Sequence, residues 1–255
     1  MADGVIEHTH EHGDHERGHH DHKHTHMVHR HRDVTGGTVR AAVFGVSDGL
    51  VSNVALILGV AAAAPDRSGV LVAGVAGLLA GAGSMAAGEY VSMKAQAELV
   101  ERELEIERRS LERQPAAELN ELAAIYRHRG IDPDQAHEMA AAVMSDPEVA
   151  LEVHAREELG IDPDETGNPV AASIGSFFAF SIGALIPLIP WFFGEGTAMI
   201  VASAVLGFVA AAIVGIVLAT FTERSKLRTV ARQVGWATAA CLITWLIGTW
   251  LGGVV

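Results

Sequence analysis

Five apolar stretches, each long enough to cross a lipid bilayer, constrain the fold of this chain more than any other feature of its sequence. A hydrocarbon core of about 30 Å is spanned by roughly 20 residues of α-helix. The stretches cover residues 40–64, 68–93, 170–193, 197–221 and 231–254. The sequence therefore predicts an all-α, polytopic membrane protein with five transmembrane helices.

The first two stretches predict a tight antiparallel hairpin, because only the short link APDRS separates them. Small residues recur in both at a spacing of four, in Gly45-xxx-Gly49 and Gly77-xxx-Gly81. Such pairs let two membrane helices approach closely. Small residues are also common in membrane helices that lack this role, so the sequence leaves both interpretations open.

Residues 94–168 are densely charged and predict a helical domain outside the membrane. The segment KAQAELVERELEIERRSLERQ consists of strong helix formers and continues the second stretch until Pro115. Gly130 predicts the end of the next helix, and Asp-Pro pairs at 132–133 and 146–147 predict the starts of two more. We expect about four helices here. The predicted division of the chain is 1–39, 40–93, 94–168 and 169–255.

Basic residues concentrate on one side of the predicted spans. The loop 222–232 contains four and the N-terminal flank contains three, whereas the loops 65–68 and 190–196 share only Arg67. The positive-inside rule then places the N-terminus, the charged domain and loop 222–232 in the cytoplasm, and the C-terminus outside. The sequence shows no organelle signal, so we expect a cell inner (plasma) membrane.

Residues 1–33 are rich in histidine and acidic residues, which predicts a disordered segment without a core. They hold 11 of the 14 histidines in the chain. Imidazole and carboxylate groups at this density bind divalent transition metals, so we interpret the segment as an auxiliary metal-binding tail. A dispensable segment or a purification remnant is the alternative, and the irregular spacing argues against the remnant. The candidate ligands are His8, His10, His12, His15, His19, His20, His22, His24 and His26.

An aspartate within an apolar stretch is the clearest sign of function. Asp48 lies about eight residues into the first stretch and Met85 about eight residues before the end of the second, so an antiparallel pair holds both at a similar depth. Glu89 and Met93 follow Met85 at intervals of about one helical turn. Carboxylate oxygens with thioether sulfurs favour a borderline transition metal over Mg²⁺ or Ca²⁺. The four residues predict a metal path; structural hydrogen bonds and simple packing are the alternatives.

Three motifs, FGVSDGLVSNVALILGV, GAGSMAAGEYVSMKAQ and SIGALIPLIPW, closely resemble the vacuolar iron transporter family, and the second has the style of a bacterial member. The resemblance runs from about Arg40 to the C-terminus and includes the charged domain. It implies a five-span protomer that dimerises and exchanges Fe²⁺ and similar divalent metals for protons, moving metal out of the cytosol. It also implies a cytoplasmic helical domain that binds metal through glutamates.

The same resemblance implies roles for individual residues. The aspartate of the family's S-D-G segment is Asp48 and the methionine of its S-M segment is Met85, and both are expected to line the path. The metal-binding residues of the charged domain match Glu107, Glu118, Glu121 and Glu158. Without the resemblance, charged helices of this kind are more often ordinary solvated surfaces.

Two departures from the family pattern change the expected ligand set. Ser110 stands three residues after Glu107, where the family often has glutamate. His154 and Ala155 stand where plant members have a Met-Met pair, so one imidazole replaces two thioethers. His154 and Glu158 are four residues apart, which puts them on one side of a helix where they could share a metal ion.

These observations predict a proton antiporter for Fe²⁺ and related divalent metals, with Mn²⁺, Co²⁺, Ni²⁺ and Zn²⁺ as candidates, working as a homodimer in the lipid bilayer. We expect no enzymatic activity and no prosthetic group. The net charge of −13 argues against nucleic acid as a partner. The alternative is a membrane-anchored metal buffer or sensor without flux. A di-iron enzyme would need paired Glu-x-x-His motifs on facing helices, and the predicted cytoplasmic helices contain none.

Overall fold

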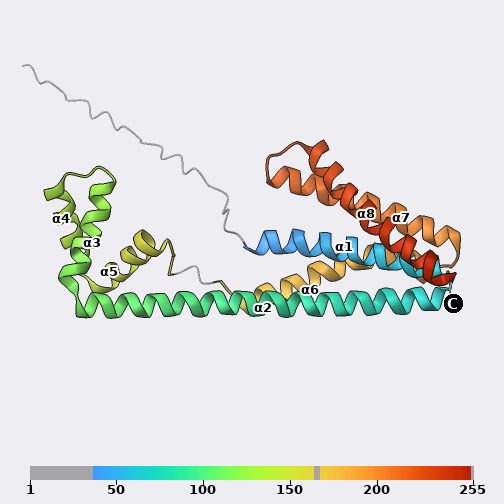
Figure 1. Cartoon of the computed structure of the whole chain (residues 1–255), viewed down its shortest axis with the longest axis horizontal. Coiled ribbons are helices and arrows are strands. Elements are labelled where there is room, and N and C mark those ends of the chain that lie inside the picture. The colour runs from blue at the N-terminus through green and yellow to red at the C-terminus, as the bar shows by residue number, and fades with distance from the viewer. Residues whose placement is uncertain (1–36, 164–166, 254–255) are drawn as a thin grey trace, which may run out of the picture. The chain divides into compact units, whose positions relative to one another are not determined.

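The structure is a computed structural model that describes residues 37–163 and 167–253. The predictions for the histidine-rich tail fall on residues 1–36 and lie outside this part of the chain. Within the described ranges every regular element is helical (Figure 1). The elements are α1 (Gly37–Ala63), α2 (Arg67–Arg113), α3 (Pro115–His128), α4 (Pro133–Val143), α5 (Pro147–His154), η1 (Ala155–Leu159), α6 (Pro169–Leu185), η2 (Ile186–Phe192), α7 (Thr197–Phe221) and α8 (Lys226–Gly252).

Five segments of the described chain are long and apolar enough to cross a membrane. They are α1, α2, the continuous pair α6 and η2, α7, and α8. The predicted all-α fold with five membrane-spanning helices is therefore confirmed, and the chain is a multi-pass membrane protein.

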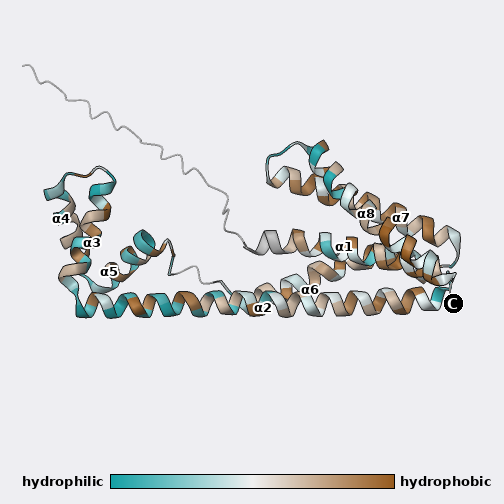
Figure 2. Ribbon diagram, viewed as in Figure 1, coloured by the Kyte–Doolittle hydropathy of each residue, from teal (hydrophilic) through white to brown (hydrophobic). Residues whose placement is uncertain are grey.

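Helix α2 is a single uninterrupted helix of 47 residues, which corresponds to about 70 Å. Asp66 caps its start by accepting a hydrogen bond from the Gly69 N–H at 2.8 Å. Figure 2 shows the change of character along it, from apolar near α1 to strongly polar near α3. The predicted continuation of the second span as a charged helix, ending just before Pro115, is confirmed.

The three helices after α2 begin and end at the residues that local chemistry predicts. Pro115 opens α3, and Gly130, with a φ of +90°, follows its end. Asp132 accepts a hydrogen bond from the Asp134 N–H at 3.0 Å, and Asp146 accepts one from the Glu148 N–H at 2.9 Å. These bonds satisfy N–H groups that the first turn of a helix leaves free.

Helix α6 packs against both α1 and α2. A methyl group on Gly49 would lie 2.1 Å from the carbonyl oxygen of Phe180, and one on Gly183 would lie 2.0 Å from the carbonyl oxygen of Val46. The Gly45/Gly49 pair therefore serves the contact of α1 with α6 rather than the α1–α2 hairpin. Gly77 faces α1 across the hairpin, next to Leu56.

The third span is not one regular α-helix, because it changes to a 3₁₀-helix at Ile186. Pro187 and Pro190 have no N–H to donate, so the α-helical hydrogen bonds fail at this point. Side chains of other spans donate hydrogen bonds to backbone carbonyls of this segment. Asn53 of α1 donates to the Ala184 carbonyl at 2.6 Å, and Ser203 of α7 donates to the Pro187 carbonyl at 2.7 Å.

The expected loop 222–232 is wrong in its length, because α8 already begins at Lys226. The apolar pattern marks where the chain enters the hydrocarbon core. Lysine and arginine are good helix formers, so the helix extends beyond the apolar stretch. Arg228 and Arg232 consequently lie on the first turns of α8 rather than in a loop.

Candidate metal centre

Four side chains from four elements converge beside the polar end of α2. They are Glu107 of α2, Glu118 of α3, His154 of α5 and Glu158 of η1, and each offers a ligand atom within 4.8 Å of all the others. The His154 Nδ1 atom lies 2.7 Å from a Glu158 oxygen, 3.3 Å from a Glu107 oxygen and 3.9 Å from a Glu118 oxygen. Three carboxylates thus surround one imidazole.

Packing of the short helices holds these groups in place. The turn at Gln114 and Pro115 folds α3 back from α2, and a core of Leu122, Tyr126 and neighbouring alanines joins α3 to α4. His154 is fully buried, and Glu107 and Glu118 are each 8% exposed. Acidic side chains are almost never this buried unless they are paired or bind an ion.

Glu158, the fourth residue of the cluster, lies in a π-helical turn, which is wider than an α-helical turn. In η1 the adjacent residues Glu157 and Glu158 serve different partners: Glu157 accepts a hydrogen bond from Arg129 at 2.8 Å, while Glu158 meets His154. Such turns are rare and occur frequently at functional sites. The turn ends at Gly160, whose φ is +65°.

The electrostatics of the cluster favour a cation. Burial raises the pKa of Glu107 above its usual value, and repulsion by Glu158 adds to this, while His154 acts in the opposite sense. Burial likewise raises the pKa of Glu158 against the lowering effect of His154. The Oε1 of Glu107 and the Nε2 of His154 have no hydrogen-bond partner among the described residues. A divalent ion among the carboxylates would offset their mutual repulsion and give the Oε1 of Glu107 a partner.

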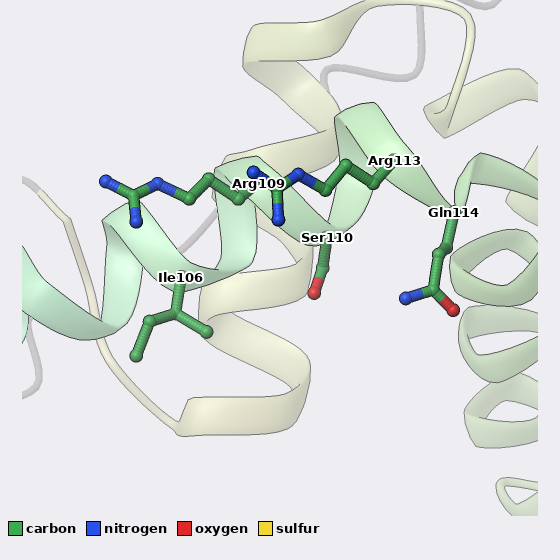
Figure 3. Close-up of a pocket in the computed structure, with 5 residues that line it drawn as sticks. All are labelled: Ile106, Arg109, Ser110, Arg113 and Gln114. Atoms are coloured by element: carbon green, nitrogen blue, oxygen red, sulfur yellow. The ribbon is translucent and has the colours of Figure 1, made fainter.

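Two further positions discussed from the sequence, the predicted ligand Glu121 and the departure Ser110, lie outside this group. Glu121 is exposed, but it is close enough to raise the pKa values of Glu107 and Glu158 by repulsion. Ser110 lines a shallow surface groove with Ile106, Arg109, Arg113 and Gln114 (Figure 3). The two arginines make this groove a poor place for a metal ion.

The residues predicted to form a path through the membrane differ in their surroundings. Met85, Glu89 and Met93 are all half-buried on α2. Met85 packs against a small core of Ala82, Phe180 and Ala184, and the Met93 methyl group faces Gly167 just before α6. Asp48 is instead exposed on α1. Their part in transport stays a prediction.

One polar contact near Asp48 was missed by the sequence reasoning. Gln233 of α8 donates a hydrogen bond from Nε2 to the Oγ of Ser47, the residue before Asp48. An amide near the start of an otherwise apolar stretch is the signal that could have drawn attention to it.

The fold defines a polytopic α-helical membrane protein in which the polar end of α2 forms a buried carboxylate–imidazole cluster together with α3, α5 and η1. Residues 39–249 match the VIT family, and the chain belongs to that family. The resemblance found in its motifs is thereby confirmed.

Curated relatives agree with this assignment. The chain is 33% identical over 194 residues to vacuolar iron transporter 1 of Eucalyptus grandis, covering 76% of this chain and 78% of that protein. It is 32% identical over 194 residues to vacuolar iron transporter 1 of Arabidopsis thaliana, with the same coverage. It is 43% identical over 155 residues to the vacuolar iron transporter of Acanthamoeba castellanii, covering 61% of this chain and 56% of that protein.

Proposed function

We propose that this protein exports Fe²⁺ and related divalent metals from the cytosol in exchange for protons. The observation that carries the proposal is the buried cluster of three carboxylates and one imidazole. Membership of a family whose relatives are named iron transporters supports transport rather than catalysis.

The cluster formed by Glu107, Glu118, His154 and Glu158 collects metal before transport. Carboxylate oxygen and imidazole nitrogen together favour Fe²⁺, Mn²⁺, Co²⁺, Ni²⁺ and Zn²⁺ over Mg²⁺. Glu121, exposed at the rim, attracts the approaching ion. The histidine-rich tail raises the local metal concentration by the same chemistry.

Metal then enters the membrane beside Glu89 and Met93 and passes Met85 and Asp48. Protons moving inward neutralise Asp48 or Glu89 after metal leaves, so that neither carboxylate stays charged and unpaired in hydrocarbon. The exposure of Asp48 in a single chain supports a homodimer, because a second copy would shield it from lipid.

The charged helices and the N-terminus face the cytoplasm and the C-terminus lies outside, in a cell inner membrane. The basic residues at the start of α8 support this orientation, because cytoplasmic flanks of membrane helices are enriched in lysine and arginine.

Flux measurements in proteoliposomes test the proposal. Vesicles are loaded with a pH-sensitive dye and given Fe²⁺, Mn²⁺, Co²⁺, Ni²⁺ or Zn²⁺, with and without a pH gradient. We expect metal uptake accompanied by proton movement in the opposite direction. Metal binding without any flux would instead favour a membrane-anchored buffer or sensor.

A further inference from the structure

The outer face of α8 carries a short basic patch next to an apolar surface. Arg228 and Arg232 are four residues apart, so they lie on the same side of the helix, and both are exposed. Trp236, one further turn along, has 73% of its surface exposed. Within the described part of the chain, neither guanidinium group has an ion pair or hydrogen bond.

The rest of this face is suited to lipid. Leu242, Ile243, Leu246 and Trp250 are 58–69% exposed, whereas Ala237, Cys241 and Gly248 on the opposite side are buried against the protein. Trp236 and Trp250 are 14 residues apart, or about 21 Å along the helix. Tryptophan is enriched at both boundaries of the hydrocarbon core, so Trp236 marks the depth at which α8 leaves it.

This arrangement places the two arginines at the depth of lipid headgroups. Arg232 lies one turn beyond Trp236 and Arg228 two turns beyond it, on the side away from the hydrocarbon. Guanidinium groups bind phosphate through paired, charge-assisted hydrogen bonds. Gly235, beside Trp236, has open space where a side chain would stand, which leaves room for an acyl chain against the helix.

We propose that this face of α8 is a binding site for an anionic phospholipid of the surrounding leaflet. Arg228 and Arg232 hold the headgroup phosphate, Trp236 lies at the level of the glycerol esters, and the acyl chains follow the exposed residues toward Trp250. Lys226 and Arg224 add positive charge at the rim of the site. The site is independent of metal transport.

Native mass spectrometry of the full chain in a neutral detergent tests the site. The protein is titrated with phosphatidylglycerol and, separately, with phosphatidylcholine of the same acyl chains. We expect the wild type to bind phosphatidylglycerol more tightly. In Arg228→Gln/Arg232→Gln this affinity should fall about 30-fold, because two cations at an anionic surface are lost, with phosphatidylcholine binding unchanged.

Matched variants and a soluble ligand complete the design. Arg113→Gln/Arg127→Gln removes two exposed positive charges elsewhere and should bind phosphatidylglycerol like the wild type. Arg228→Lys/Arg232→Lys keeps the charge but loses the paired hydrogen bonds, so its affinity should lie between those of the wild type and the glutamine variant. This variant keeps the test decisive if the glutamine variant fails to fold. Equal binding of both lipids by the wild type would overturn the proposal, as would full displacement of the lipid by inorganic phosphate.

Discussion

The carboxylate–imidazole cluster beside α3 and the polar residues of the membrane spans differ in how completely one chain encloses them. His154 is fully buried among three carboxylates that come from separate elements. Asp48, in contrast, is exposed on α1, and Glu89 and Met93 are only half-buried on α2. Under the proposed function, the cluster binds an ion and can be closed by packing, whereas Asp48, Glu89 and Met93 pass the ion onward and stay accessible to it. The comparison predicts different responses to substitution.

The largest effect is expected at Asp48. Replacing its carboxylate by an amide in Asp48→Asn removes the group proposed to hold metal and carry the proton, so metal-driven proton movement in proteoliposomes should fall to background. Folding should be intact, because Asp48 is exposed and does not support the core. Ser52→Ala, one turn away on the same exposed side, is the matched control. Normal transport by Asp48→Asn would remove the distinction between the two regions.

The second effect separates metal capture from transport. Glu107→Gln removes a buried ligand, so affinity of the cluster for Mn²⁺ should fall at least about tenfold, since even loss of an outer partner of a metal ligand has this effect. Transport at saturating metal should persist. Isothermal titration measures the affinity, with Glu101→Gln on the exposed side of α2 as the control. Unchanged affinity in Glu107→Gln would exclude the cluster as the binding site.

The third effect is a pH dependence of stability. Folding raises the pKa values of Glu107 and Glu158 above the ordinary value of 4.5. The folded protein therefore binds protons that the unfolded chain releases, so the stability contributed here is present below pH 4.5 and is lost as the pH rises through the raised pKa values.

Thermal unfolding of the full chain across this pH range measures that loss. Added Mn²⁺ should restore stability at the higher pH values, because the ion replaces the protons. The metal-free Glu107→Gln variant should show a weaker dependence than the wild type. An identical pH profile in the two proteins would contradict this explanation.

The smallest effect is expected at Glu121, which shares a helix with Glu118 but lies exposed outside the cluster. Glu121→Gln should weaken metal binding by only about twofold to threefold, and high salt should abolish the difference, because exposed charges are screened. Glu118→Gln in the same titration should have a much larger effect that persists in salt. Equal losses in the two variants would show that both glutamates bind the ion directly.

Local chemistry predicted most of the helices. Pro115, Asp132 and Asp146 mark boundaries through hydrogen bonds and missing N–H groups within a few residues, and the structure places helix ends there. The start of α8 and the 3₁₀ segment after Leu185 were not predicted. Hydropathy indicates which residues can lie in the hydrocarbon core. It does not indicate where a helix begins or where α-helical hydrogen bonds change to 3₁₀ ones.

The residues of the candidate site were harder to predict from the sequence than the helices were. Spacing alone relates His154 to Glu158, four residues away, and only the family resemblance related them to Glu107 and Glu118. Glu118 and Glu121 are equivalent in sequence, and the rotation of α3 about its axis decides which one is buried. That rotation depends on how Leu122 and Tyr126 pack against α4, which no local pattern reveals.

The unbroken length of α2 sets the ionic environment of the carboxylate–imidazole cluster. Glu107 lies 14 residues beyond Met93, where the apolar part of the helix ends, and thus about 21 Å along the helix from the edge of the hydrocarbon core, of which the headgroup layer takes about 5–8 Å. At physiological ionic strength the diffuse layer of counterions over charged headgroups decays within about 8 Å. The cluster therefore lies largely beyond the field of the headgroups, and changes in lipid composition should leave its occupancy unaltered.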